Sequence, residues 1–150
     1  EPAIELEAAA WRALDNEIAH FPDDNAGYFA SGPSWLDGPY VLDQKALFEA
    51  LLGGIEAGAP ADRLALDFHV AVARSSARIA SDICAHEGIG TVALSGGVFM
   101  NRLLLQLLTR ELKSMGLTVL IPQTVPVNDG CIAYGQAAVA SARLAQIASQ

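Results

Sequence analysis

The sequence predicts an α/β fold with a helix-rich first half and a strand–helix–strand unit in its second half. Hydrophobic residues recur every three to four positions in residues 3–19 and again after residue 43, as on the buried face of a helix. Two short apolar runs, residues 91–94 and 117–121, then flank another helical pattern. Strands joined in this way are expected to be parallel, with a right-handed crossover. Because both runs are apolar throughout, we expect the strands to be covered on both faces, with helices of the first half among the cover.

The first half is expected to contain three helices and one loop-rich segment. Residues 3–19 carry a broad apolar stripe and form the first helix. Residues 25–43 are rich in Gly, Pro, Ser and Asp, and their runs GYFA and GPYVLD are typical of two short strands around a loop. The aromatic residues of this segment need a surface to pack on: Tyr28, Phe29, Trp35 and Tyr40.

The next two helices have recognisable ends. Asp43 suits the N-cap of a helix that ends near Gly58. Pro60 suits the first turn of a longer helix, which Gly88 or Gly90 stops.

The second half continues with a helix over residues 101–115, between the two strands, that Gly116 stops. A final helix over residues 132–147 carries Ala and Gly on most sides. Since a helix that is apolar on almost every side is usually buried, we expect this helix to lie in the interior.

The size and composition of the chain favour a single domain. It has 150 residues, of which 52% are hydrophobic and 17% charged, so a substantial core is expected rather than disorder. No apolar run reaches the roughly 18–20 residues that a membrane span needs, and no signal peptide is recognisable. The first residue is Glu1 and a helical pattern follows at once, so we interpret the chain as a fragment of a longer protein.

The net charge of −8 argues against a nucleic-acid surface, where a basic face is expected. The charge is uneven: residues 1–88 hold 15 acidic and 5 basic residues, and residues 89–150 hold 2 acidic and 4 basic residues. Residues 89–150 therefore repel an anion less than residues 1–88 do. Arg110 and Lys113 also fit a simple solvated helix face.

The cysteines and one histidine favour structural roles. Cys84 and Cys131 lie far apart without disulfide or zinc-site spacing, which fits the reducing cytoplasm. Cys131 has no histidine near it in sequence to act as a base, so a buried thiol is favoured over a nucleophile. His69 follows Phe68 in a helical pattern and is interpreted as a packing residue.

The loop Ser95-Gly96-Gly97 follows the first strand, and ligands of open α/β sheets bind at the carboxyl ends of the strands. Because glycine lacks a Cβ, the backbone N–H groups of this loop can meet an anion, aided by the N-terminus of the helix that follows. Asn101 is able to cap that helix or to reach a ligand. A plain strand-to-helix turn is the alternative, since the loop matches neither the Walker A pattern nor the dinucleotide fingerprint.

A second unusual loop, Asn128-Asp129-Gly130, precedes the last helix and is expected at the same sheet edge. Asp129 is one of the two acidic residues after residue 88. Its carboxylate suits either a helix N-cap or a hard oxygen ligand for a metal ion that bridges phosphates.

Four motifs resemble, in order, the carboxyl-terminal end of the HypF family, the carbamoyltransferases of NiFe-hydrogenase maturation. The two specific ones are LSGGVFMNRLLL and VPVNDGCIAYGQAAVA, at residues 94–105 and 125–140. AIELEAAA and FHVAVA resemble a glutamate-rich helix and a Phe-His helix of the same family. The pattern is more distantly similar to the tRNA threonylcarbamoyladenosine transferases, which share the actin-like ATPase (ASKHA) fold.

The resemblance implies a longer protein in which acylphosphatase, zinc-finger and YrdC-like domains precede this segment, which is then the second lobe of an actin-like carbamoyltransferase domain. The implied activity uses carbamoyl phosphate and ATP to form a carbamoyl-adenylate. The carbamoyl group then passes to the carboxyl-terminal cysteine of HypE, as precursor of the metal-bound cyanide. ATP and a divalent metal ion, Mg²⁺ or another, are the implied cofactors.

The same resemblance implies roles for individual residues. Ser95, Gly96, Gly97 and Asn101 would contact the nucleotide phosphates. Asp129 would bind the metal ion, and Glu7 and Glu5 would lie near the nucleoside. The paired histidines of the family's metal site are absent from this sequence, so the segment alone is expected to catalyse little. It is still expected to fold, and its exposed face is expected to favour self-association.

Two other functions stay open. One is threonylcarbamoyl transfer to tRNA on the same fold, against which the net charge of −8 and the sequence NDG count. The other is a docking module without chemistry.

Overall fold

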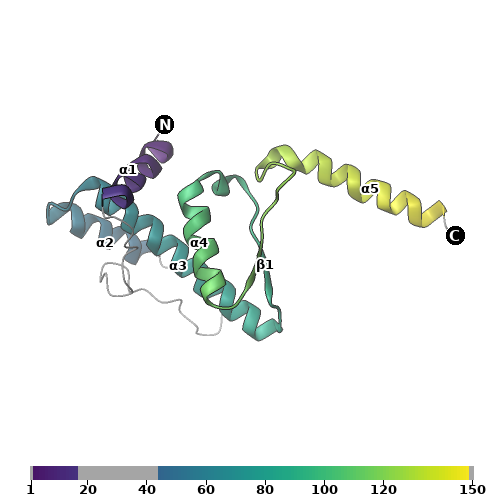
Figure 1. Cartoon of the computed structure of the whole chain (residues 1–150), viewed down its shortest axis with the longest axis horizontal. Helices are drawn as coiled ribbons and strands as arrows, with labels where there is room; N and C mark the ends of the chain where they lie inside the picture. Colours follow the sequence, from purple (N-terminus) through teal and green to yellow (C-terminus); the bar gives the residue numbers. More distant parts are fainter. Residues whose placement is uncertain (1, 17–43, 149–150) are drawn as a thin grey trace.

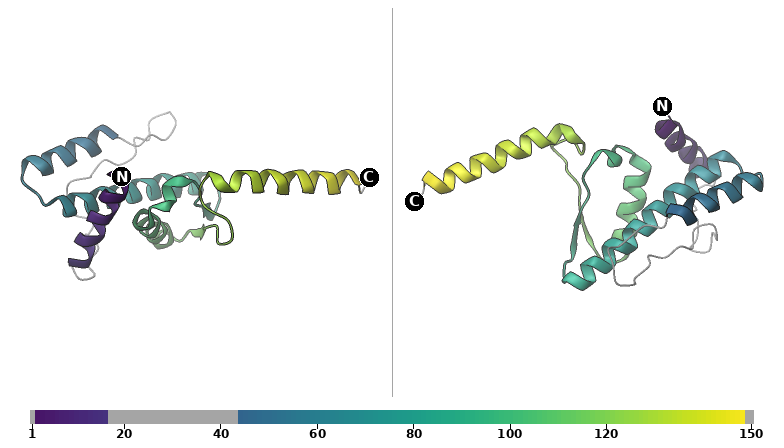
Figure 2. Two further views of the ribbon diagram at one scale, coloured as in Figure 1. Left: turned by 90° about the horizontal axis from the view of Figure 1, so that it is seen from above. Right: turned by 180° about the vertical axis from the view of Figure 1, so that it is seen from behind.

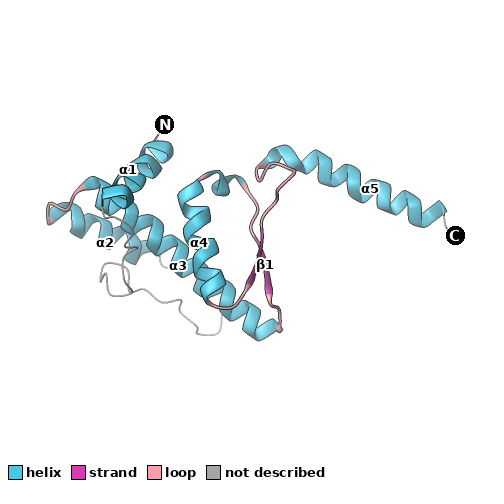
Figure 3. Ribbon diagram, in the orientation of Figure 1, coloured by secondary structure: helices cyan, strands magenta, loops and turns pink. Residues whose placement is uncertain are grey.

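The structure, a computed structural model, describes residues 2–16 and 44–148. Over these residues the chain forms helices and one small parallel sheet (Figure 3). The elements in chain order are α1 (Pro2–Asn16), α2 (Gln44–Glu56), α3 (Ala61–Glu87), β1 (Thr91–Ala93), the 3-10 turn η1 (Gly97–Met100), α4 (Arg102–Ser114), β2 (Thr118–Leu120), the 3-10 turn η2 (Asp129–Cys131) and α5 (Ile132–Ala148). The predicted strands and aromatic residues of segment 25–43 and the Asp43 cap lie outside the described residues.

Two glycines end the central helices, as the sequence predicts. Gly88 follows α3 with φ 67° and donates its N–H to the carbonyl of Cys84. Gly116 follows α4 with φ 81°. Both lie in the left-handed region, which glycine enters without the steric penalty of a Cβ.

The core lies where α1, α3 and α4 pack together (Figure 1). Alanines face each other where α1 meets α3, and leucines of α4 fill the space beside them. The most deeply buried of these side chains are Ala10, Ala73, Ala77, Leu66, Leu103 and Leu112. At the edge of the packed helices, Arg12 on α1 makes a 2.9 Å ion pair with Asp62 on α3, whose hydrogen bonds and charge raise the pKa of Arg12.

β1 and β2 are parallel neighbours, and α4 connects them, so the predicted strand–helix–strand unit is confirmed. Val92 pairs with Val119 at the centre of the register. Only these two central residues are half-buried, and the residues before and after them in each strand are exposed. The prediction that both faces of the sheet are covered is therefore wrong for the described residues, because α4 and its neighbours form a layer on one side only.

α5 points away from the rest of the molecule in every view (Figures 1 and 2). Its side chains from residue 132 to residue 147 are all exposed, including large apolar ones such as Tyr134, Val139 and Leu144. The prediction of a buried helix is thus wrong within the described part of the chain. The apolar composition still indicates that this helix needs a cover, since large apolar surfaces rarely stay bare.

Candidate functional site

The two unusual loops meet at one edge of the sheet. After β1 and β2 the strands stay together, because Leu94 donates its N–H to the carbonyl of Leu120 at 2.9 Å. The first loop then contacts the second: the N–H of Gly96 donates to the carbonyl of Val127 at 2.6 Å. The prediction that the loops lie together at the carboxyl ends of the strands is confirmed, and it is at this edge that α/β proteins bind ligands.

The two adjacent glycines differ in backbone conformation. Gly96 has φ 112° and ψ 158°, a conformation that residues with a Cβ rarely adopt, so the turn itself requires glycine there. Gly97 has no such φ, and a Cβ added to it would meet no atom within 4 Å. The turn interpretation therefore accounts for Gly96 only. Gly97 is exposed, so its backbone is open to solvent and leaves room for a ligand to approach.

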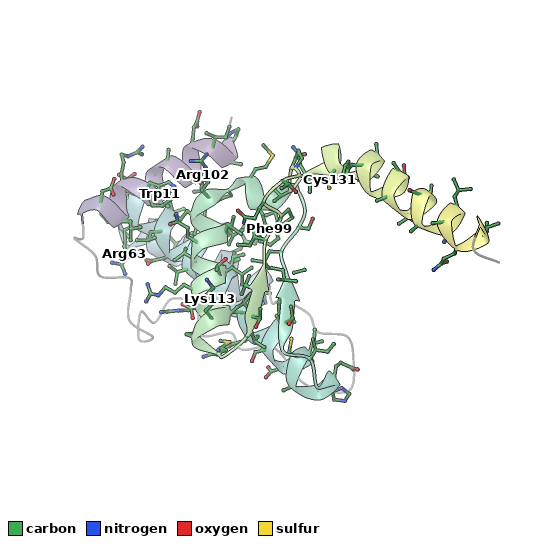
Figure 4. All side chains as sticks on the ribbon, turned by 45° about the vertical axis from the view of Figure 1, so that its right-hand side comes forward. Trp11, Arg63, Phe99, Arg102, Lys113 and Cys131 are labelled. Atoms are coloured by element: carbon green, nitrogen blue, oxygen red, sulfur yellow. The ribbon has the colours of Figure 1, made fainter. Side chains whose placement is uncertain are left out.

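The N-terminus of α4 is already bound by side chains. Asn101 is its N-cap, with Oδ1 accepting from the N–H of Leu104 at 2.8 Å. Glu7, which comes from α1, accepts from the N–H groups of Arg102 at 2.8 Å and Leu103 at 3.2 Å through a single oxygen, Oε1. Figure 4 shows Arg102 beside α1, the helix that also carries Trp11.

This arrangement changes the expected basis of anion binding. The first three N–H groups of α4 all have protein acceptors, and the Glu7 carboxylate places a negative charge where the helix dipole is positive. The start of α4 therefore offers none of these three N–H groups to a phosphate, which corrects the expectation that the helix N-terminus aids anion binding. The pairing joins residues 95 positions apart, and no local sequence signal identifies it.

His69 lies beneath this loop on α3, is 3% exposed, and is hydrogen-bonded at both ring nitrogens. Nδ1 lies 2.7 Å from the carbonyl oxygen of Ala65, and Nε2 lies 2.9 Å from Nδ2 of Asn101. Its ring also meets Phe68 edge-on, with 6.0 Å between ring centroids. The interpretation of His69 as a satisfied packing residue is confirmed, but its contact with the predicted site residue Asn101 was not foreseen from the sequence.

In the second loop the cap is Asn128, not Asp129. Asn128 accepts from the N–H of Gly130 at 3.1 Å and donates from Nδ2 to the sulfur of Met100 at 3.5 Å, which adds a second link between the loops. Asp129 is exposed in the first turn of η2, so the capping role considered for it belongs to its neighbour. Cys131, at the end of the same turn, is half-buried.

The predicted site residues thus fall into two groups. Ser95, Gly96, Gly97, Asn101 and Glu7 gather around the first loop and the start of α4, whereas Glu5 lies two residues before Glu7 and is exposed. Asp129 lies in the second loop. Within residues 2–16 and 44–148, no three His, Cys, Asp or Glu side chains come close enough to hold a metal ion. None of the helices described there is long and apolar enough to cross a membrane.

The bond between Glu7 and α4 predicts a stability effect. Replacing Glu7 with alanine is expected to lower the free energy of unfolding of the chain by about 2 kcal/mol, because a charged acceptor for two backbone N–H groups is lost. Urea unfolding followed by circular dichroism measures this change. Asp15→Ala, which removes an exposed charge from the same helix, is the control. Equal losses for the two variants would contradict the assigned role of Glu7.

The observed molecule is an α/β protein rich in helices, with a glycine-containing loop at the carboxyl edge of a small parallel sheet. Within this class, known proteins identify its family. Residues 1–136 match the family described as the second subdomain of the Kae1-like carbamoyltransferase domain. The chain belongs to the HypF carbamoyltransferase family, as the sequence resemblance predicts.

Individual relatives agree with this assignment. The chain is 36% identical to a carbamoyltransferase HypF homolog of Cupriavidus necator over 94% of its own length, and 39% identical to carbamoyltransferase HypF of Rhizobium leguminosarum over 72%. It covers 34% and 15% of those proteins. Two solved structures are similar: full-length HypF in a phosphate- and nucleotide-bound form, with a TM-score of 0.74 and 29% identity, and HypF of T. kodakarensis, with 0.70 and 27%. The two comparisons span 95% and 97% of this chain, and 17% of each solved chain.

Proposed function

We propose that this chain is the nucleotide-binding lobe of an ATP-dependent carbamoyltransferase, and that it forms the second lobe of an actin-like (ASKHA) domain in a longer protein. The proposed reaction joins carbamoyl phosphate and ATP into a carbamoyl-adenylate. The carbamoyl group then passes to the carboxyl-terminal cysteine of a HypE-type acceptor, for the cyanide ligand of NiFe-hydrogenase. The observation that carries the proposal is the contact between the two loops, with open space over Gly97 beside them.

The residues around this space have chemistry that suits a nucleotide. Ser95 and the backbone of Gly97 are assigned to the phosphates, because a hydroxyl and unhindered N–H groups are good donors to anionic oxygens. Asn101 has two N–H bonds on Nδ2, and one of them faces His69, so the other is assigned to a phosphate oxygen. Glu7 holds α4 with Oε1, and its second carboxylate oxygen is assigned to the ribose hydroxyls, with Glu5 near them.

A divalent metal ion is part of the proposal, and Asp129 is its proposed ligand. The described residues alone do not fit a complete site, because Asp129 is a single exposed carboxylate and no cluster of three ligands surrounds it. The remaining ligands would have to come from nucleotide phosphates or from other parts of the longer protein. The open face of the sheet and the exposed helix α5 support such a second wall.

Replacing Asp129 with asparagine tests this function in the full-length protein. Asparagine keeps the shape of the side chain and removes the charge that a divalent ion needs. We expect metal content and carbamoyl transfer to fall at least tenfold, while stability changes by less than about 1 kcal/mol, the usual worth of a charge at a helix N-terminus.

Metal analysis, a transfer assay and thermal unfolding of the same preparations give the three values. Asp82→Asn is the matched control, since it removes an exposed carboxylate from α3, away from both loops. Metal content and transfer at the wild-type level in Asp129→Asn would exclude Asp129 as a ligand.

A docking module remains a second candidate, because α5 exposes apolar side chains along its length. Such a module would bind a partner protein whether or not ATP is present. Loss of partner binding on nucleotide removal would favour the transferase.

A further inference from the structure

His69 is a buried polar side chain that reaches the candidate site without lining it. It lies on α3, 32 residues before Asn101 in the sequence, and contacts that residue through a side chain–side chain hydrogen bond. Its other ring nitrogen bonds to the carbonyl of Ala65, one turn earlier on the same helix. Both ring nitrogens are therefore hydrogen-bonded, and the ring links the side chain of Asn101 to α3.

The direction of each hydrogen bond that links Leu104, Asn101, His69 and Ala65 follows from the backbone groups at the two ends of this series. The N–H of Leu104 is a donor, so Asn101 must face it with Oδ1 and must face His69 with its NH₂ group. Nε2 of His69 then accepts, which leaves the proton of the neutral ring on Nδ1, where the carbonyl of Ala65 accepts it. A single arrangement satisfies all of these groups, and it defines the orientation of the Asn101 amide.

We propose that His69 is a positioning residue for the nucleotide: by accepting from Asn101, it holds the amide so that the second N–H of Nδ2 is ready for a phosphate oxygen. This inference rests on the proposed nucleotide site. Without an acceptor at this position, the Asn101 amide is held only through Oδ1, and its NH₂ group has to be ordered further when the ligand binds. Ordering one such side chain reduces affinity by roughly two- to tenfold.

Two variants of His69 separate positioning from packing. His69→Phe keeps an aromatic ring of similar size and removes both nitrogens. His69→Gln carries Oε1 at about the reach of Nε2, so it can still accept from Asn101. We expect ATP affinity of the full-length protein, measured by calorimetry, to fall two- to tenfold in His69→Phe and to recover in His69→Gln.

The Asn101→Ala background shows whether His69 acts through Asn101. If it does, His69→Phe has no further effect on ATP affinity once Asn101 is alanine. An equal loss in both backgrounds, or wild-type affinity in His69→Phe, would overturn the positioning role. Wild-type protein that binds no ATP at all would instead refute the proposed nucleotide site itself.

The tautomer is an independent check on the 150-residue chain, and it needs no nucleotide. The ¹⁵N resonances of the His69 ring are expected to show the proton on Nδ1, and Asn101→Ala is expected to change the Nε2 resonance. A proton on Nε2 would contradict the bond direction on which the proposal depends, even if ATP binds.

Discussion

Replacing Gly97 with valine is expected to lower the ATP affinity of the full-length protein by between about tenfold and a hundredfold. The side chain would fill the space over the η1 turn, where a Cβ now meets nothing within 4 Å. A phosphate held there would lose its backbone hydrogen bonds, and bonds to a charged group contribute about 1.5–3 kcal/mol, where each ~1.4 kcal/mol is tenfold in affinity. Titration calorimetry with ATP measures the change.

The neighbouring glycine supplies the contrast. Because φ of Gly96 is 112°, Gly96→Ala is expected to destabilise the fold by about 1–3 kcal/mol, whereas Gly97→Val should melt within a few degrees of wild type. Thermal unfolding of both variants therefore shows whether a loss of affinity is a loss of fold. Unchanged ATP affinity in Gly97→Val would exclude the backbone of Gly97 as a phosphate-binding group.

The second large effect concerns the core beneath the site. Leu103→Ala is expected to lower the free energy of unfolding of the 150-residue chain by about 3 kcal/mol, within the usual range of about 2–5 kcal/mol for a buried leucine. Leu103 is fully buried on the first turn of α4, between the capped N-terminus and the contacts with α3. For a chain of this size that loss lowers the melting temperature by about 6–12 °C.

Leu144→Ala is the matched control, because it makes the same change in a helix at a residue that is 67% exposed. We expect its effect to be below about 0.5 kcal/mol, as for most surface substitutions. Equal losses at the two positions would mean that α5 is covered in the isolated chain, contrary to the structure. In the full-length protein the cost of Leu144→Ala should rise, if another lobe covers α5.

Several features of this protein follow from its sequence alone, because their signals are local. Gly88 and Gly116 end α3 and α4 where the chain must turn into the left-handed region. The strand–helix–strand unit follows from two apolar runs around one helical period. The two loops share an edge because parallel strands end on the same side, and the motifs in those loops identify the family.

Other features were decided by the tertiary structure, because they depend on partners distant in sequence. The acceptor for the first N–H groups of α4 is Glu7, and the support of Asn101 is His69; neither pairing leaves a local pattern. In the second loop, Asn128 and Asp129 both suit a cap by residue type, and the backbone geometry selects Asn128. A motif therefore identifies which residues gather, while the packing of the helices decides which of them already have protein partners.

Burial was likewise predicted only in part from the sequence. Apolar composition predicted cover for α5 and for both faces of the sheet, and within the described residues the structure leaves α5 and one face of the sheet exposed. An apolar composition shows that burial of a surface is favourable, but the surface is buried only where another element packs against it. The sequence by itself determined the helices, the strand pairing and the family of this protein. The tertiary structure alone decided which surfaces are buried and which polar groups are already satisfied, because both depend on neighbours in space.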